Sequence, residues 1–217
     1  MTTIIAIDAM GGDFGPSETI PASLAMQKNY PNISLILVGK QDEIESELKK
    51  HKAQTSDLLK VHHASEVVEM HEAPSLALRN KKDSSMRVAI ELVRDNHAHA
   101  CVSAGNTGAL MATARFLLKM LPGIDRPAIC SAMPGIGKPC HMLDLGANID
   151  SSSEQLFQFA VMGTQLVSAL HNNPNPSVAL LNVGSEDIKG SDTVKQAATL
   201  LNESDLNYVG FAEGNDI

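Results

Sequence analysis

Polar residues and glycines follow several apolar segments of this chain, and their types suit the binding of an anion. The densest such stretch supplies a serine, two glycines and possible helix caps: Ser103, Gly105, Asn106, Thr107 and Gly108. Glycines let a ligand approach the backbone, and Asn or Thr can cap the helix that follows. Free N–H groups at a helix start attract an anion such as phosphate. A capped turn without a ligand would have the same sequence, so this stretch alone leaves both interpretations open.

Three further loops combine acids, amides and glycines in the same way. Their candidate ligand residues are Asp8, Gly11, Gly12 and Asp13 in the first loop, Asp144, Gly146 and Asn148 in the second, and Asn182 and Gly184, followed by Asp187, in the third. Each loop alone is typical of a turn. If all four loops follow strands of one parallel sheet, they meet at its carboxyl edge, where α/β proteins bind ligands. The set therefore predicts a binding site.

The segment 79–94 is basic in a protein with a net charge of −8, since it holds five basic and two acidic residues. Ser84 and Ser85 stand at a predicted helix start, just after Arg79 and Lys82. Hydroxyls, N–H groups and cations at one helix start form a second candidate anion site. A solvated charged face would have the same composition, so both interpretations stay open here too.

Composition excludes several other classes of function. With 25 acidic and 17 basic residues, the chain is not a general nucleic-acid binder. Three cysteines in apolar surroundings indicate reduced thiols, the start does not resemble a signal peptide, and no uncharged apolar run is long enough to cross a membrane. Dinucleotide, Walker A and nucleophile-elbow motifs are absent from the sequence, and His97 and His99 lack partners for a metal site. We expect neither a metal nor a cofactor.

The elements that would position these residues alternate between strands and helices. Apolar runs predict strands at 3–7, 33–38, 58–62, 101–103, 128–133, 141–145, 178–182 and 208–212. Helical periodicity and capping signals predict helices at 17–29, 42–50, 75–80 and 83–95, from 107, from 153, and at 193–202. The alternation predicts an α/β fold, a three-layer α/β/α sandwich with a mostly parallel sheet. We expect 1–217 to form a single domain that is incomplete at its C-terminus.

Five motifs, in order, carry a family resemblance: DAMGGD at 8–13, RNKKDSSM at 79–86, SAGNTGA at 103–109, DLGAN at 144–148 and NVGSE at 182–186. Over essentially its whole length the chain resembles the bacterial phosphate acyltransferases known as PlsX, whose members are longer. The resemblance implies a Rossmann-like fold similar to isocitrate and isopropylmalate dehydrogenases and to phosphate acetyltransferases. It also implies transfer of a fatty acyl group from acyl carrier protein to inorganic phosphate, for phospholipid synthesis.

The same resemblance implies a cytoplasmic homodimer that associates with the inner face of the membrane. There a membrane glycerol-3-phosphate acyltransferase would consume the acyl phosphate. Two alternatives remain open at this point. One is a phosphate acetyl- or butyryltransferase that uses acyl-CoA. The other is a non-catalytic module that binds phosphate or the carrier protein.

This chemistry needs no serine or cysteine nucleophile, because phosphate attacks by itself and a thiol is a good leaving group. The site has only to hold the phosphate beside the thioester and to stabilise the oxyanion that forms. We expect Asn106 to donate to the oxyanion or to phosphate, and Arg79 or Lys82 to neutralise the phosphate charge. Asp144 belongs to the acids that shape the cleft or move a phosphate proton.

Overall fold

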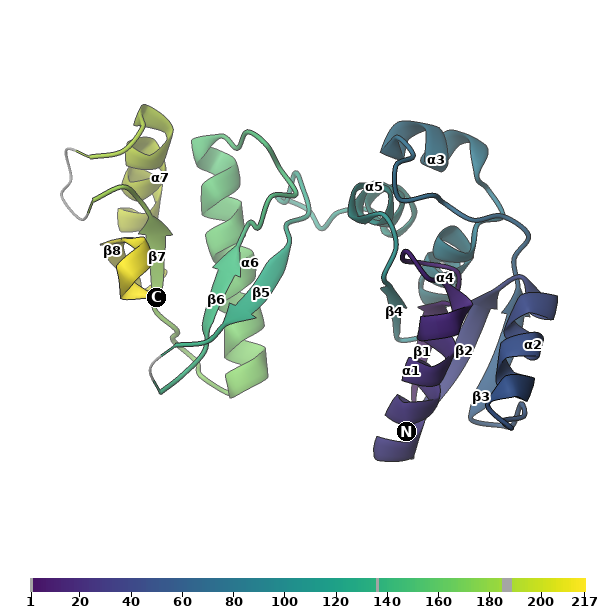
Figure 1. Cartoon of the computed structure of the whole chain (residues 1–217). Helices are drawn as coiled ribbons and strands as arrows, with labels where there is room; N and C mark the ends of the chain where they lie inside the picture. The colour runs from purple at the N-terminus through teal and green to yellow at the C-terminus, as the bar shows by residue number, and fades with distance from the viewer. Residues whose placement is uncertain (1, 136, 185–188) are drawn as a thin grey trace. The chain divides into compact units, whose positions relative to one another are not determined.

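Figure 1 shows the computed structural model, which describes residues 2–135, 137–184 and 189–217. The chain folds into two units, Met1–Lys119 and Met120–Ile217. The prediction that 1–217 forms a single domain stays a prediction. None of the helices in the described ranges is both long enough and apolar enough to span a membrane.

A parallel sheet with the strand order β3-β2-β1-β4 forms the centre of the first unit. Its strands are β1 (Thr3–Asp8), β2 (Ile33–Gly39), β3 (Leu59–His63) and β4 (Ala100–Ser103). The register pairs Asp8 with Ser103, so that β1 and β4 end side by side. Two of the four candidate loops therefore leave the same edge of one sheet, as predicted.

Helices cover both faces of this sheet (Figure 1). On one face α1 (Pro16–Asn29) and α2 (Gln41–Lys50) pack on Ile5, Ile7, Leu35 and Leu37. On the other, α4 (Ser85–Arg94) packs on Ala6 and its neighbours, while α3 (Pro74–Asn80) and α5 (Thr107–Leu118) contact each other. Apolar side chains on both faces of a strand produce the continuous apolar runs seen in the sequence. The predicted three-layer arrangement is confirmed in this unit.

The second unit contains two smaller sheets. The antiparallel pair is β5 (Cys130–Met133) and β6 (Cys140–Leu143), and the parallel pair is β7 (Val178–Leu181) and β8 (Tyr208–Ala212). The helices α6 (Ser153–His171) and α7 (Asp192–Asn202) pack together, and their apolar side chains share a core with β7 and β8. A short 3-10 helix, η1 (Gly214–Asp216), follows β8.

The prediction that all four loops follow strands of one sheet is wrong, because the described strands form three sheets. Only six residues separate β5 from β6, and a connection that short joins antiparallel rather than parallel neighbours. Asp144 follows β6 and Asn182 follows β7, so their loops belong to the two sheets of the second unit.

Candidate functional site

An aspartate and a serine meet where β1 and β4 end. Asp8 is only 2% exposed, and its Oδ2 accepts a hydrogen bond of 2.6 Å from the Ser103 hydroxyl. The Ser103 oxygen in turn accepts the N–H of Gly105 at 3.1 Å. Because the serine proton points to a carboxylate, it is not available to an anion. The Ser103 hydroxyl thus joins β4 to β1, and the prediction that Ser103 binds phosphate stays a prediction.

The two glycine loops above this pair are in direct backbone contact. A Cβ added to Gly11 would lie 2.7 Å from Asp8 Oδ2 and 2.9 Å from the nitrogen of Gly105. A Cβ added to Gly105 would lie 3.0 Å from the methyl carbon of Met86. Gly12 has a φ of +90°, which favours glycine. These positions need glycine because the chain segments approach closely. The prediction that the glycines let a ligand approach the backbone stays a prediction.

Asn106 caps α5, and its amide also holds a distant turn. Its Oδ1 accepts the N–H of Ala109 at 3.0 Å. Its Nδ2 donates to the carbonyl oxygens of Glu69, Met70 and Glu72 at 3.3, 3.0 and 2.9 Å. Both ends of the amide are therefore occupied within the first unit. The predicted donation of Asn106 to an oxyanion stays a prediction, and the structure adds a positioning role.

The first two residues of α5, Thr107 and Gly108, are exposed. Asn106 satisfies the next two N–H groups, those of Ala109 through its side chain and Leu110 through its carbonyl. Within the described ranges no hydrogen bond uses the N–H of Thr107 or Gly108. These two N–H groups lie at the positive end of the helix dipole, where unpaired N–H groups attract an anion.

The start of α4 is closed by the chain itself. Ser84 and Ser85 are each 1% exposed, and the Ser84 hydroxyl caps the helix while donating to the Lys81 carbonyl at 3.0 Å. The N–H of Ser85 donates to the Glu66 carbonyl, and the N–H of Glu66 donates to Asp83. These contacts occupy the Ser84 hydroxyl and the Ser85 N–H within the chain, and the second anion site stays a prediction.

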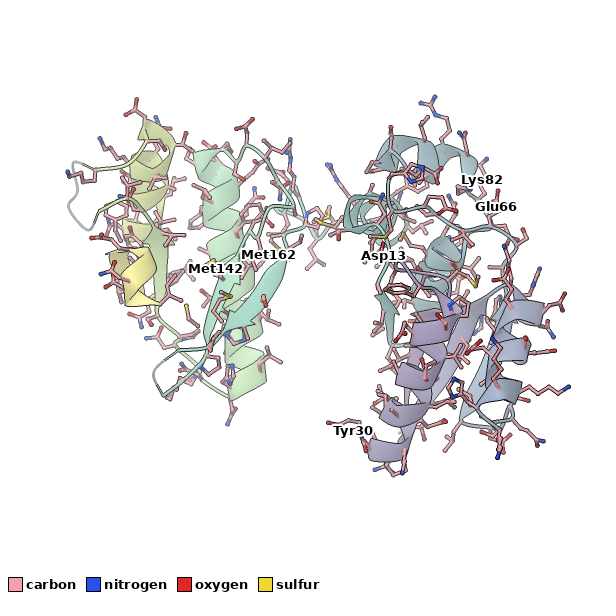
Figure 2. The ribbon with its side chains drawn as sticks, viewed as in Figure 1. Asp13, Tyr30, Glu66, Lys82, Met142 and Met162 are labelled. Atoms are coloured by element: carbon pink, nitrogen blue, oxygen red, sulfur yellow. The ribbon has the colours of Figure 1, made fainter. Side chains whose placement is uncertain are left out.

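The two basic candidates, Arg79 and Lys82, are exposed and form no hydrogen bond or ion pair with any residue that the structure describes. Lys81, between them, is used internally: its Nζ donates to the Val67 carbonyl at 2.9 Å and lies 3.9 Å from a Glu72 oxygen. Figure 2 shows Lys82 near Glu66. Glu66 belongs to the segment whose backbone contacts the start of α4. Arg79 and Lys82 thus keep their charges available to a ligand or a partner.

Asp144 organises a loop of the second unit. Its carboxylate accepts the N–H groups of Ile129 and Asn148 at 2.7 Å each, that of Ala147 at 3.3 Å, and the Asn148 side chain at 3.1 Å. The Asn148 amide also donates to the Pro127 carbonyl at 3.0 Å. Partial burial raises the pKa of Asp144, but these hydrogen bonds together outweigh it and leave the pKa below its usual range. A carboxylate so stabilised is a weak base.

Of the remaining candidates, Asp13 belongs to the first unit, and Gly146, Asn182 and Gly184 belong to the second. Asp13 is exposed (Figure 2) and has no hydrogen-bond or salt-bridge partner in the described part of the chain. Gly146, with a φ of +86°, has the backbone of a turn. Asn182 donates to the Lys189 carbonyl at 3.3 Å, and Gly184 is buried. Asp187 lies outside the described residues.

Comparison with known proteins decides the family. Residues 3–217 match the family model described as "fatty acid synthesis protein". The chain belongs to this family. Among relatives named phosphate acyltransferase, those of Methylococcus capsulatus and Nitrosococcus oceani are 58% identical over 99% and 100% of this chain, and one of Legionella pneumophila is 59% identical over 97%. The chain spans 63%, 64% and 62% of the lengths of these relatives.

Solved structures confirm the fold of this family member. A EutD phosphotransacetylase from Staphylococcus aureus matches with a TM-score of 0.65 at 18% sequence identity. The match covers 97% of this chain and 68% of the phosphotransacetylase chain. A 4-hydroxythreonine-4-phosphate dehydrogenase from Burkholderia phymatum has a TM-score of 0.56 at 15% identity, covering 97% of this chain and 74% of its own. The predicted likeness to phosphate acetyltransferases is confirmed at the level of fold. The matching dehydrogenase supports the predicted Rossmann-like fold, although it is neither an isocitrate nor an isopropylmalate dehydrogenase.

Several residues that contact the candidate site of this family member were not predicted from the sequence. Glu66, Glu69, Met70 and Glu72 contribute backbone carbonyls, which every residue has. Only the cap signal of Asn106 pointed to this region, since Asn is a preferred N-cap.

Replacing Asp144 with asparagine should weaken the second unit in a pH-dependent way. At neutral pH we expect Asp144→Asn to lower the free energy of unfolding by about 2 kcal/mol, as for lost hydrogen bonds to a charged group. Because the pKa of Asp144 is lowered by folding, its stabilisation is present above about pH 4, the usual aspartate range, and is lost as pH falls through the lowered value. Urea unfolding from pH 7 to pH 2 measures this. A difference between wild type and variant that stays constant over that range would contradict it.

Proposed function

We propose that this family member transfers an acyl group from a thioester to inorganic phosphate. The observation that carries the proposal is the open start of α5, where the Thr107 and Gly108 N–H groups offer a phosphate site. The names of relatives at 58% and 59% identity, phosphate acyltransferase, support the reaction.

The proposed reaction requires little covalent chemistry from the protein. An oxygen of hydrogen phosphate attacks the thioester carbonyl, the C–S bond breaks, and the phosphate proton passes to the departing thiolate. The products are an acyl phosphate and a thiol. The start of α5 would orient the phosphate, and Arg79 or Lys82 would offset its charge. Asn106 would act by holding this start, since donation to the oxyanion requires it to release one of its carbonyl partners.

We assign fatty acyl carrier protein as the acyl donor, on the strength of the family resemblance. Carrier proteins of this kind are acidic, and the exposed Arg79 and Lys82 offer opposite charge on an otherwise acidic protein. On the same basis, the working protein is a cytoplasmic homodimer at the inner membrane face. It passes acyl phosphate there to a membrane glycerol-3-phosphate acyltransferase.

Removing the Lys82 charge should slow the reaction without affecting the fold. We expect Lys82→Ala to lower kcat/KM about threefold at low salt, within the range for an exposed charge contact. The deficit should shrink as salt is added, since screening removes the wild-type advantage. Lys28→Ala is the matched control, because Lys28 is an exposed lysine of α1, in the layer on the other face of the sheet. Equal effects of the two variants would contradict a specific role for Lys82.

One assay separates the proposed function from its alternatives. The full-length protein is incubated with acyl carrier protein thioester or with acyl-CoA, each with and without phosphate, and acyl phosphate is detected by mass spectrometry. Phosphate-dependent product from the carrier-protein thioester alone supports the proposal. Product from acyl-CoA favours a phosphate acetyl- or butyryltransferase. Phosphate binding without product from either donor favours a binding module.

A further inference from the structure

Asp8 is a buried acid that the fold alone does not require. It is 2% exposed, and its Oδ1 has no hydrogen-bond partner among the described residues. Burying a carboxylate that is only partly satisfied is costly, and the end of a strand can be completed by an apolar or neutral residue. Such a residue calls for a role that offsets the cost.

The contacts of Asp8 suggest this role. Its Oδ2 lies 2.6 Å from the Ser103 oxygen, so that the serine proton is directed to the carboxylate. The serine lone pairs are then free to accept the Gly105 N–H at 3.1 Å. The Ser103–Asp8 bond and the Gly105–Ser103 bond together connect β1, through β4, with the turn before α5. A side chain at Asp8 therefore controls the direction of a hydrogen bond made by the turn.

The Asp8 carboxylate also lies close to Gly11, in the loop that follows β1. A Cβ on Gly11 would lie 2.7 Å from Asp8 Oδ2, and one on Gly105 would lie 3.5 Å from it. Asp8 thus lies against both glycine loops, and neither loop can shift independently while the Asp8–Ser103 bond holds. The turn that it fixes leads directly into the exposed N–H groups of Thr107 and Gly108.

We propose that Asp8 is a positioning residue for phosphate binding: through Ser103 it fixes the 105–108 turn and sets the direction of the N–H groups that receive the anion. This inference rests on the proposed phosphate site at α5. Asp8 itself does not touch the phosphate. Its negative charge opposes an anion, so positioning and charge have effects of opposite sign on affinity.

Because positioning and charge change phosphate affinity in opposite directions, variants of Asp8 can distinguish them. Calorimetric titration of the full-length protein with phosphate measures the Kd. Asp8→Ala removes both the charge and the acceptor, and we expect it to raise the phosphate Kd about tenfold. Asp8→Asn removes the charge but keeps an acceptor for Ser103, so it should recover most of the lost affinity. Ser103→Ala should match Asp8→Ala, and the double variant should be no weaker than either, because both changes break one chain of hydrogen bonds.

Other roles predict other results. If Asp8 is only a nearby charge, both Asp8 variants bind phosphate more tightly. If it only supports the fold, its variants behave like Ser23→Ala, which removes a buried hydroxyl that donates to the Thr19 carbonyl in α1 and should lower stability alone. Either result overturns the proposal, as do additive effects of Asp8→Ala and Ser103→Ala. If Asp8→Ala does not fold, Ser103→Ala decides, and an unchanged Kd overturns the proposal. A wild-type protein that binds no phosphate overturns the proposed phosphate site itself.

Discussion

Replacing Gly11 with alanine is expected to weaken phosphate binding about a hundredfold, the loss that a displacement of about 1 Å can cause. The added Cβ would lie 2.7 Å from Asp8 Oδ2, 2.9 Å from the Gly105 nitrogen and 3.1 Å from the Ser103 oxygen. Two of these atoms belong to buried acid and backbone, which cannot rotate away as the end of a flexible side chain can. The loops must separate, and the turn before α5 moves with them. We expect a stability loss of about 2 kcal/mol, within the range for overpacked cores.

Gly214→Ala is the matched control for this replacement. A Cβ at Gly214 would meet nothing within 4 Å, and Gly214 is not among the glycines with a positive φ. Its stability should stay within about 0.5 kcal/mol of wild type. Urea unfolding and phosphate titration measure both variants. Wild-type behaviour of Gly11→Ala would show that the two glycine loops are not in contact in solution, and the proposed geometry would fail with it.

The sequence was sufficient to predict what local patterns encode. Continuous apolar runs at 3–7 and 33–38 predicted β1 and β2 correctly, because a strand that is covered by helices on both faces carries apolar side chains on both faces. The predicted helix at 83–95 begins within two residues of α4, whose N-cap is Ser84. These signals lie within a few residues of the element that they predict, which is why they could be read.

Local sequence patterns could not predict which strands pair or which residues the loops contact. Asp8 ends β1 and Asp144 follows β6, and both precede glycines. Yet Asp8 accepts a hydrogen bond from a serine of the neighbouring strand, while Asp144 accepts from N–H groups of its own loop and of Ile129. The difference depends on which strand lies beside each one. β1 has a parallel neighbour on each side, whereas the one described strand that pairs with β6 is antiparallel β5. Local sequence does not specify that choice.

Backbone contacts are the other feature that residue types do not indicate. The start of α4 looked open because its sequence offers hydroxyls and nearby cations, but the carbonyl of Glu66 accepts the N–H of Ser85. Likewise, the Asn106 amide is bound by carbonyls more than 30 residues away. Since every residue carries a carbonyl, no residue type marks such a contact. Among the described residues, the Ser85 N–H at the start of α4 has a backbone partner, whereas the N–H groups of Thr107 and Gly108 at the start of α5 have none.

Replacing Asn106 should damage that open start more than any other change to α5. Asn106→Ala removes the cap of Ala109, worth about 1 kcal/mol, and three contacts to the 69–72 turn, for a total loss of about 2–3 kcal/mol. Asn106→Ser keeps a good cap but lacks the amide that reaches the turn. We therefore expect Asn106→Ser to be nearly as stable as wild type at α5, while the 69–72 turn exchanges its amide hydrogens faster. Hydrogen exchange followed by mass spectrometry measures both segments separately.

The same two variants distinguish positioning from direct catalysis in the full-length enzyme. If Asn106 acts by holding the turn, Asn106→Ser weakens phosphate binding and raises the KM for phosphate in step with the faster exchange at 69–72. If its amide instead donates to the oxyanion, the serine variant loses about 10²–10³ in kcat, as for a missing oxyanion donor. In that case phosphate affinity and the exchange of the turn stay at wild-type values. Such a result would contradict the positioning role, and it would require Asn106 to exchange a carbonyl partner for the substrate during the reaction.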